Sequence, residues 1–157
     1  GNCHLQHLTL RQAKYCGVDG WSSFTMEDVL VEQCGFSGVV ASGTGVVGRC
    51  TNVEVRQCGA CGVAADNGAS ITLIGATTTV HHNCTSGNSC ACGLNVSFSA
   101  SSTVQLVSPL TKETVAVDNG GGGNWGVVDG GDINQIKTIA ATTTAVSETK
   151  SNSSAKN

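Results

Sequence analysis

The sequence predicts an all-β protein built as a β-solenoid, a stack of about five coils with three short strands in each. Three observations carry this prediction: a recurring glycine-containing dipeptide, short apolar segments separated by turn residues, and an unusual composition. Charged residues make up only 12% of the chain, which has 21 glycines and one proline. Such a composition is typical of regular strands and turns rather than helices.

The recurring dipeptide is Gly-Val or Gly-Leu, and its five copies lie 21, 24, 31 and 33 residues apart. An apolar-x-apolar triplet precedes each copy, at residues 8–10, 29–31, 53–55, 78–80 and 115–117. A period of this size indicates stacked units that cannot bury their apolar faces alone. The glycines of the five copies are Gly17, Gly38, Gly62, Gly93 and Gly126.

Each triplet is expected to form the first strand of a coil, because its apolar residues alternate with polar ones. A second strand should follow each repeated glycine directly. A third is expected at residues 23–26, 46–47, 71–73, 104–106 and 133–136. Turn residues such as those at 66–68 and 129–131 separate these segments. Residue identities also recur at fixed positions, since 31–35 (VEQCG) returns as 55–59 (VRQCG), which a β-sandwich does not explain.

The coil period and the glycine column resemble the right-handed parallel β-helix repeats of the pectin-lyase-like superfamily. The resemblance covers about residues 5–139. The segment from Ile71 through His81, His82 and Asn83 is similar to repeats in predicted secreted or surface proteins of unicellular algae and protists. The resemblance implies a right-handed parallel β-helix over residues 1–139. Residues 140–157 form a Ser/Thr/Ala-rich extension, interpreted as a tail or as a glycosylated or inter-subunit segment.

Nine cysteines indicate an oxidising compartment. Stacked strands lie about 4.8 Å apart, which suits a disulfide between cysteines of one column. Reduced packing cysteines are the alternative, and the repeat explains the Cys-x-x-Cys spacing without zinc, so we predict no metal site and no cofactor. Cys3, Cys16 and Cys50 have no assignable partner. The disulfide candidates are Cys34 with Cys58, Cys61 with Cys92, and Cys84 with Cys90. Cys84 and Cys90 bracket an insertion in the fourth coil.

Three Asn-x-Ser/Thr triplets, at Asn83, Asn95 and Asn152, are candidates for N-glycosylation. Together with the cysteines they predict an extracellular or cell-surface location. A formal charge of −3 argues against nucleic-acid binding, and no apolar run approaches the roughly 18 residues of a membrane span.

No pair of carboxylates or other catalytic constellation stands out, because most acidic residues occur at turns. We therefore predict no catalytic residues and no enzyme activity. The predicted function is an extracellular structural or adhesion module, glycosylated, that stacks head to tail into a surface fibre or sheath. The alternative is a carbohydrate-binding or carbohydrate-active β-helix of the lyase or epimerase kind, whose predicted contacts are Asp28, Glu54, Arg56 and His82.

An ice-binding solenoid is a further, minor alternative, suggested by the threonine triplets at 77–79 and 142–144. It requires threonine at the same outward position in successive coils. The aligned column reads Thr9, Leu30, Glu54, Thr79 and Ala116, which is not a threonine ladder.

Overall fold

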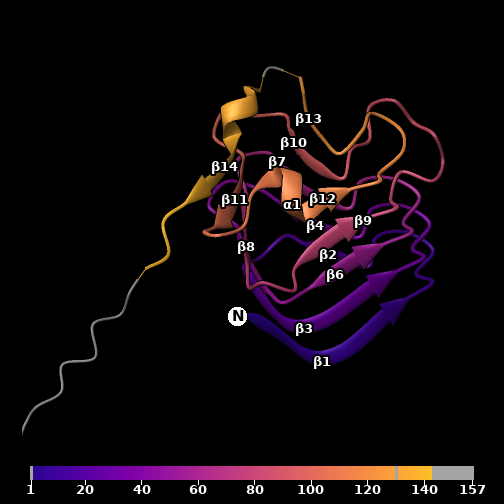
Figure 1. Cartoon of the computed structure of the whole chain (residues 1–157), viewed down its shortest axis with the longest axis horizontal. Helices are drawn as coiled ribbons and strands as arrows, with labels where there is room; N and C mark the ends of the chain where they lie inside the picture. The colour runs from indigo at the N-terminus through magenta and orange to yellow at the C-terminus, as the bar shows by residue number, and fades with distance from the viewer. Residues whose placement is uncertain (1, 130, 143–157) are drawn as a thin grey trace, which may run out of the picture.

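Two parallel β-sheets make up the protein, as seen in a computed structural model that describes residues 2–129 and 131–142 (Figure 1). The larger sheet has nine strands: β1 (Cys3–Arg11), β3 (Phe24–Glu32), β5 (Val47–Thr51), β6 (Glu54–Arg56), β8 (Ser70–Ile74), β9 (Thr79–His81), β11 (Thr103–Val107), β12 (Ala116–Val117) and β14 (Ile136–Ile139). The smaller sheet has five: β2 (Val18–Gly20), β4 (Val39–Ser42), β7 (Val63–Asp66), β10 (Leu94–Ser97) and β13 (Trp125–Val128). The all-β class and the parallel strands agree with the sequence prediction.

Each strand pairs in parallel with its counterpart one repeat further along the chain. In the larger sheet Leu10 pairs with Val31, Val31 with Val55, and Val55 with Val80. In the smaller sheet, Val39 of β4 pairs in the same way with Val63 of β7, the residue after the next repeated glycine. Pairing at the repeat distance places the first four repeated glycines side by side, as the sequence predicts.

The long strands β1 and β3 each belong to two faces of the larger sheet. The first half of β3 pairs with β5 and its second half with β6, so the sheet bends within the strand. The bend lies at Asp28, whose backbone has a φ of 52°, and at the equivalent His7 of β1. In later coils the strand is interrupted at this corner, between β5 and β6 and between β8 and β9.

The fifth repeat departs from the predicted register. Trp125, rather than Val127, pairs with Leu94, so Asn124 and not Gly126 continues the glycine column. Trp125 and Val127 both pack against the apolar core, and the glycine-rich turn before Trp125 brings this residue into line with Leu94, because Gly93 N donates to Gly123 O and Leu94 N to Asn124 O.

Two short helices also replace predicted strand residues in this part of the chain. Residues Lys112–Val115 form α1, capped by Thr111, and only β12 remains of the strand expected at 115–117. Its Ala116, and not an adjacent valine, pairs with Val80. Residues Ile133–Gln135 form the 3-10 helix η1, and the last strand begins at Ile136.

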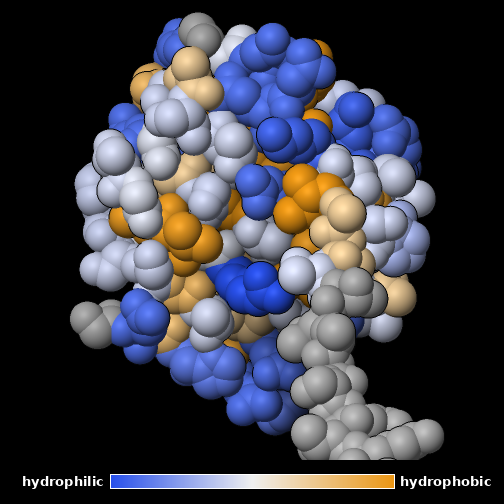
Figure 2. Space-filling view, turned by 90° about the vertical axis from the view of Figure 1, so that its left-hand side faces the viewer, coloured by the Kyte–Doolittle hydropathy of each residue, from blue (hydrophilic) through white to orange (hydrophobic). Residues whose placement is uncertain are grey.

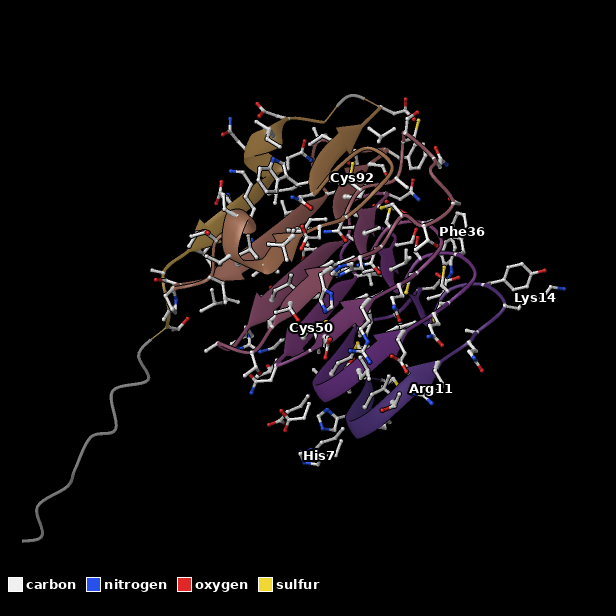
Figure 3. All side chains as sticks on the ribbon, turned by 45° about the vertical axis from the view of Figure 1, so that its right-hand side comes forward. His7, Arg11, Lys14, Phe36, Cys50 and Cys92 are labelled. Atoms are coloured by element: carbon white, nitrogen blue, oxygen red, sulfur yellow. The ribbon has the colours of Figure 1, made fainter. Side chains whose placement is uncertain are left out.

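The apolar core lies between the two sheets. Alternate residues of each strand point inward, so the valines of the repeated triplets and the residues after the repeated glycines share one cluster. Cys50 lies inside with them, whereas Phe36 projects outward from a turn (Figure 3). The largest fully buried side chains include Met26, Val31, Val55, Val63, Ile71, Leu73, Val80, Leu94 and Leu106.

At the N-terminal end, β1 forms the edge of the stack (Figure 1). Within the described residues it pairs with β3 alone, and its inward residues Leu5, Leu8 and Leu10 are only partly buried. On the side where β8, β11 and β14 lie, hydrophilic and hydrophobic residues are interspersed (Figure 2). The predicted extension begins just after β14, and residues 143–157 lie outside the described part of the chain.

Candidate functional site

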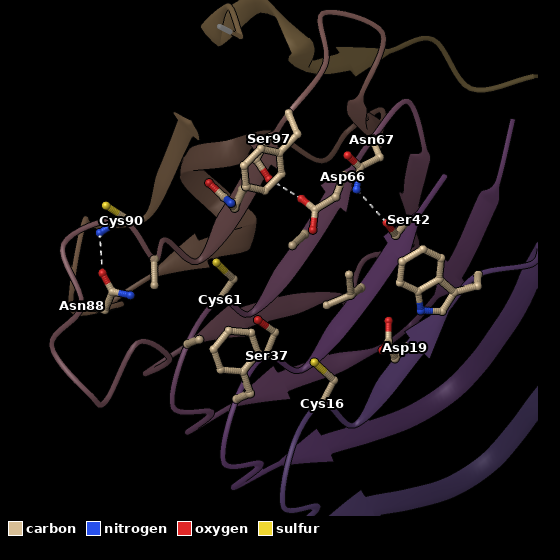
Figure 4. A pocket seen from close by; sticks show the side chains of 18 residues that line it. Cys16, Asp19, Ser37, Ser42, Cys61, Asp66, Asn67, Asn88, Cys90 and Ser97 are labelled. Atoms are coloured by element: carbon tan, nitrogen blue, oxygen red, sulfur yellow. Dashed lines mark hydrogen bonds between the residues drawn. The ribbon is translucent and has the colours of Figure 1, made fainter. Parts of the chain in front are cut away.

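A groove of about 370 Å³ runs across the outer face of the smaller sheet (Figure 4). It crosses β2, β4, β7 and β10, so it spans three gaps between neighbouring strands, roughly 14 Å. The residues of one wall, including Asn88 and Cys90, come from the insertion that lengthens the fourth coil. We call this site the lateral groove.

Two rows of side chains form the floor of the lateral groove. They point outward because the residue before each of them in its strand packs in the core. The strand register aligns Asp19, Val40, Ala64 and Asn95 in the first row. In the second row it aligns Ser42, Asp66 and Ser97.

Most of the floor is buried although it faces away from the core. Val40, Ala64 and the neighbouring Cys61 pack in a second, small apolar cluster with Cys84 and Ala91, residues at the ends of the insertion. The insertion therefore folds back over the sheet and gives the groove its depth.

Three exposed aromatic side chains surround the groove. Trp21, Phe36 and Phe98 are 70%, 56% and 59% exposed and come from the first, second and fourth coils. Large aromatic side chains usually gain their stabilisation by burial. Three of them exposed around one groove indicate a binding surface.

Phe98 has the least expected backbone conformation of the three. Its φ of 59° is left-handed, a conformation that costs roughly 1–2 kcal/mol for an ordinary L-residue. The equivalent corner positions of other coils are Gly43, Asn67 and Asp129, which tolerate this conformation better. Neither burial nor backbone preference explains a phenylalanine here, and strained residues of this kind concentrate at functional sites.

The groove is acidic. Its carboxylates are those of Asp19 and Asp66, and none of the described residues that line it is lysine, arginine or histidine. Burial raises the pKa of Asp66, the hydrogen bond from Ser97 opposes the rise, and the charge of Asp19 adds to it. An uncompensated negative potential therefore faces whatever enters.

Asn95 lies on the floor and is only 6% exposed. Its Oδ1 is shielded from solvent and accepts no hydrogen bond from any described residue. A buried polar atom without a partner is costly, and rotation of the amide exchanges Oδ1 with Nδ2. The side chain thus keeps hydrogen-bonding capacity that a ligand can use. Elsewhere in the groove, Asn67 donates to Ser42 Oγ at 3.1 Å, and Asn88 Oδ1 accepts from the Cys90 amide at 2.9 Å (Figure 4).

Cys16 and Cys61 are poor nucleophiles, whereas the third cysteine that lines the groove, Cys90, is exposed. Burial raises the pKa of Cys61 to about 11 and also raises the pKa of Cys16. Their thiols are therefore neutral near pH 7, and the thiolate is the reactive form. Within the described residues, no group of three or more His, Cys, Asp or Glu side chains is arranged to hold a metal ion.

All nine cysteines lie within residues 2–129, and none is disulfide-bonded in the structure. Cys34 and Cys58 occupy neighbouring coils, since the amide after Cys58 donates to Cys34 O at 2.9 Å. Cys61 and Cys92 are related in the same way, at 3.3 Å. The columns thus match the sequence prediction, and these two pairs stay candidates for a disulfide.

The third pair is less favourable. Cys84 is buried in the small cluster beneath the groove, whereas Cys90 is exposed on the insertion. The insertion is held without a bond between them.

Two of the three predicted N-glycosylation sites, Asn83 and Asn95, are buried in the folded protein, which disfavours a glycan at either of them. Asn83 is 1% exposed, and its Nδ2 donates to Val55 O at 3.0 Å and to Asn119 Oδ1 at 3.1 Å. It belongs to a ladder of amides at one corner of the coils and has no room for a glycan. Asn95 lies on the groove floor, and Asn152 is outside the described residues.

Of the residues predicted as carbohydrate contacts, Glu54 and Arg56 lie on β6 of the larger sheet and pair with each other. Asp28, at the bend of β3, meets His7 at 3.2 Å, and His82, directly after β9, meets His81 at 2.7 Å. Arg56 donates to Glu32 and Glu54 at 2.7 and 3.1 Å, and His81 meets Glu54 at 2.9 Å. The lateral groove was missed because its residues come from four coils. Two features of the sequence could have indicated it: Phe98, at a corner position that holds Gly, Asn or Asp in other coils, and the insertion in the fourth coil.

No protein-family model, curated protein or solved structure matches the chain. Within the described residues, no helix has the length and hydropathy needed to cross a membrane.

Proposed function

We propose that the chain is a right-handed parallel β-helix that serves as a non-catalytic carbohydrate-binding module in adhesion at a cell surface. The β-helix is supported by strand pairing at the repeat distance in both sheets. Right-handed connections are the rule for parallel strands. Further support comes from corners at which the backbone φ is positive in coil after coil. One such column contains Gln12, Gln33, Gln57, His82 and Asp118.

Carbohydrate binding rests above all on the aromatic residues around the lateral groove, and on Phe98 in particular. The C–H face of a sugar ring packs flat against an aromatic ring, while its hydroxyl groups need carboxylate, amide and hydroxyl partners. Trp21, Phe36 and Phe98 supply the first kind of contact. Asp66, Asn95 and their neighbours supply the second. A concave site with apolar walls and a few oriented polar groups is typical of ligand binding.

Binding without turnover is proposed because the two carboxylates of the groove, Asp19 and Asp66, lie about two strand spacings apart, and Ser97 holds the Asp66 carboxylate by a hydrogen bond. The thiols of Cys16 and Cys61 are neutral near pH 7. The groove therefore favours the carbohydrate-binding alternative over a module whose role is only structural.

Self-stacking is a second candidate function, favoured by the edge strand β1. Its unpaired side and the partly buried Leu5, Leu8 and Leu10 would be covered by a strand of another copy. Light scattering over a range of concentrations tests this. Growth of the particle mass supports stacking, and a constant monomer mass excludes it.

The test of carbohydrate binding is a glycan array read with the wild type and two variants. Phe98→Asn relieves the left-handed strain, so the variant should unfold at a slightly higher temperature and yet lose binding. Tyr15→Ala removes an aromatic side chain that is 69% exposed but lies outside the groove, and it should bind as the wild type does. If no glycan binds the wild type, or if Phe98→Asn binds equally well, the proposed function is wrong.

A further inference from the structure

The lateral groove carries features that select among carbohydrates, and the following inference rests on the proposed function. Its lining combines two carboxylates with exposed aromatic faces, and none of the described residues in it is cationic. An acidic polysaccharide would bring more negative charge into this field. A ligand that carries positive charge would be attracted.

We propose that the groove binds oligosaccharides of amino sugars, whose ammonium groups meet Asp19 and Asp66. A protonated amine forms a charge-assisted hydrogen bond with a carboxylate, and such bonds are stronger than neutral ones. The same cation gains from the faces of Trp21 and Phe98.

The spacing of the two carboxylates favours an oligomer over a single sugar. Asp19 lies on β2 and Asp66 on β7, two strand spacings apart, so about 10 Å separates their positions along the stack. One ammonium group cannot bind both carboxylates at that separation. An oligomer that carries an amine on each of its sugar units can bind both at once.

Asn95 provides an independent reason to expect a hydrogen-bonding ligand. The residue is more than nine-tenths buried on the floor, in the coil that carries Phe98, and its Oδ1 has no partner among the described residues. Rotation of the amide exchanges this oxygen with the more accessible nitrogen, and the oxygen then accepts a hydrogen bond from a hydroxyl or amine group of the amino sugar. The partial burial of Asp66 strengthens the preference, because a charge in a less polar setting attracts a cation more than an exposed one does.

The test compares three oligosaccharides of equal length by isothermal titration calorimetry near pH 6: a glucosamine oligomer, its N-acetylated counterpart, and an oligogalacturonate. The glucosamine oligomer should bind at least about tenfold more tightly than the N-acetylated one, and the oligogalacturonate should not bind. Asp66→Asn and Asp19→Asn should each remove most of this preference. Added salt should weaken it.

The control variant is Asp118→Asn, which removes one exposed carboxylate at a corner outside the groove. It should leave the preference unchanged, whereas a general attraction between a polycation and an acidic protein would fall equally in all three variants.

The two proposals fail in different ways. Equal affinity for the glucosamine oligomer and its N-acetylated form, or a preference that survives both groove variants, overturns the selection by charge but leaves carbohydrate binding standing. Absence of binding to any of the three sugars and to the glycan array overturns both.

Discussion

Ser97 Oγ donates a hydrogen bond to Asp66 Oδ1 between two neighbouring strands in the floor of the lateral groove. The bond holds the carboxylate in place and opposes the rise in its pKa that burial causes. The protonation of Asp66 therefore changes the negative charge of the groove, to which Asp19 also contributes.

Affinity for the glucosamine oligomer should fall as the pH is lowered through the pKa of Asp66, which lies above its ordinary value of 3.8. The sign follows because protonation removes the charge that attracts the ligand. Ser97→Ala removes the bond that favours the charged form, so the loss should begin at a higher pH. Titration calorimetry at several pH values measures this. Asp66→Asn should remove the contribution of this residue to the loss of affinity in acid, and an unchanged acid dependence in that variant contradicts the assignment.

Gly62→Ala should destabilise the protein by about 3 kcal/mol or more. A β-carbon at Gly62 would lie 2.3 Å from Val80 Cγ1 and 2.8 Å from Gly93 O, so the neighbouring coil would have to move. Gly87→Ala is the control, because open space surrounds that position and only its φ of 74° opposes the change, at roughly 1–2 kcal/mol. Urea unfolding compares the two. Equal losses in the free energy of unfolding would mean that the glycine column does not set the distance between neighbouring coils.

Glu32→Gln should lower the melting temperature near neutral pH and reduce its dependence on acid. Hydrogen bonding from Arg56, assisted by Arg11, lowers the pKa of the Glu32 carboxyl below its ordinary value. A lowered pKa means that the folded state favours the charged form. Its stabilising contribution is therefore present above the pKa of the unfolded chain and is lost as the pH falls through the folded value.

Thermal unfolding from neutral pH into the acid range tests this, with Glu27→Gln as the matched control. The Glu27 carboxylate meets the amide of Gln6 rather than an arginine, so that variant should follow the wild type. A Glu32→Gln variant with the wild-type acid dependence would contradict the role given to the ion pairs.

Thiol alkylation of the native protein should be fast at Cys3 and Cys90, which are exposed. Burial raises the pKa of Cys50, Cys58 and Cys84 to about 12, so these residues should react only after unfolding.

Intact mass before and after reduction shows whether the stacked pairs are oxidised. If they are, the bonds should join Cys34 to Cys58 and Cys61 to Cys92. A bond between Cys84 and Cys90 would contradict the burial of Cys84 in the small cluster.

The repeat columns of the first four coils could be predicted because the first three coils repeat their apolar residues at the same offset from the glycine, and the insertion at Cys84 to Cys90 accounts for the longer offset of the fourth. Val31, Val55 and Val80 pair as their positions indicate. The fifth coil could not be predicted in this way. Its Gly126 repeats the dipeptide but not the register, since the glycine-rich turn at residues 120–123 brings Trp125 and not Val127 opposite Leu94.

The buried sequons illustrate the same limit. A three-residue pattern identifies Asn83 and Asn95, but burial depends on what the neighbouring coils place over them. Asn83 is bonded to Asn119, 36 residues away in the chain, and no local pattern indicates that contact.

By itself, the sequence determined the all-β class, the parallel stacking and the columns of glycine, valine and cysteine, because these depend on spacing along the chain. Only the tertiary structure decided where a ligand can bind. The lateral groove needs outward residues of four coils, an insertion folded over them, and Phe98 held in a left-handed corner. These contacts join residues that are distant in sequence, and only the stacking of the coils brings them to one face.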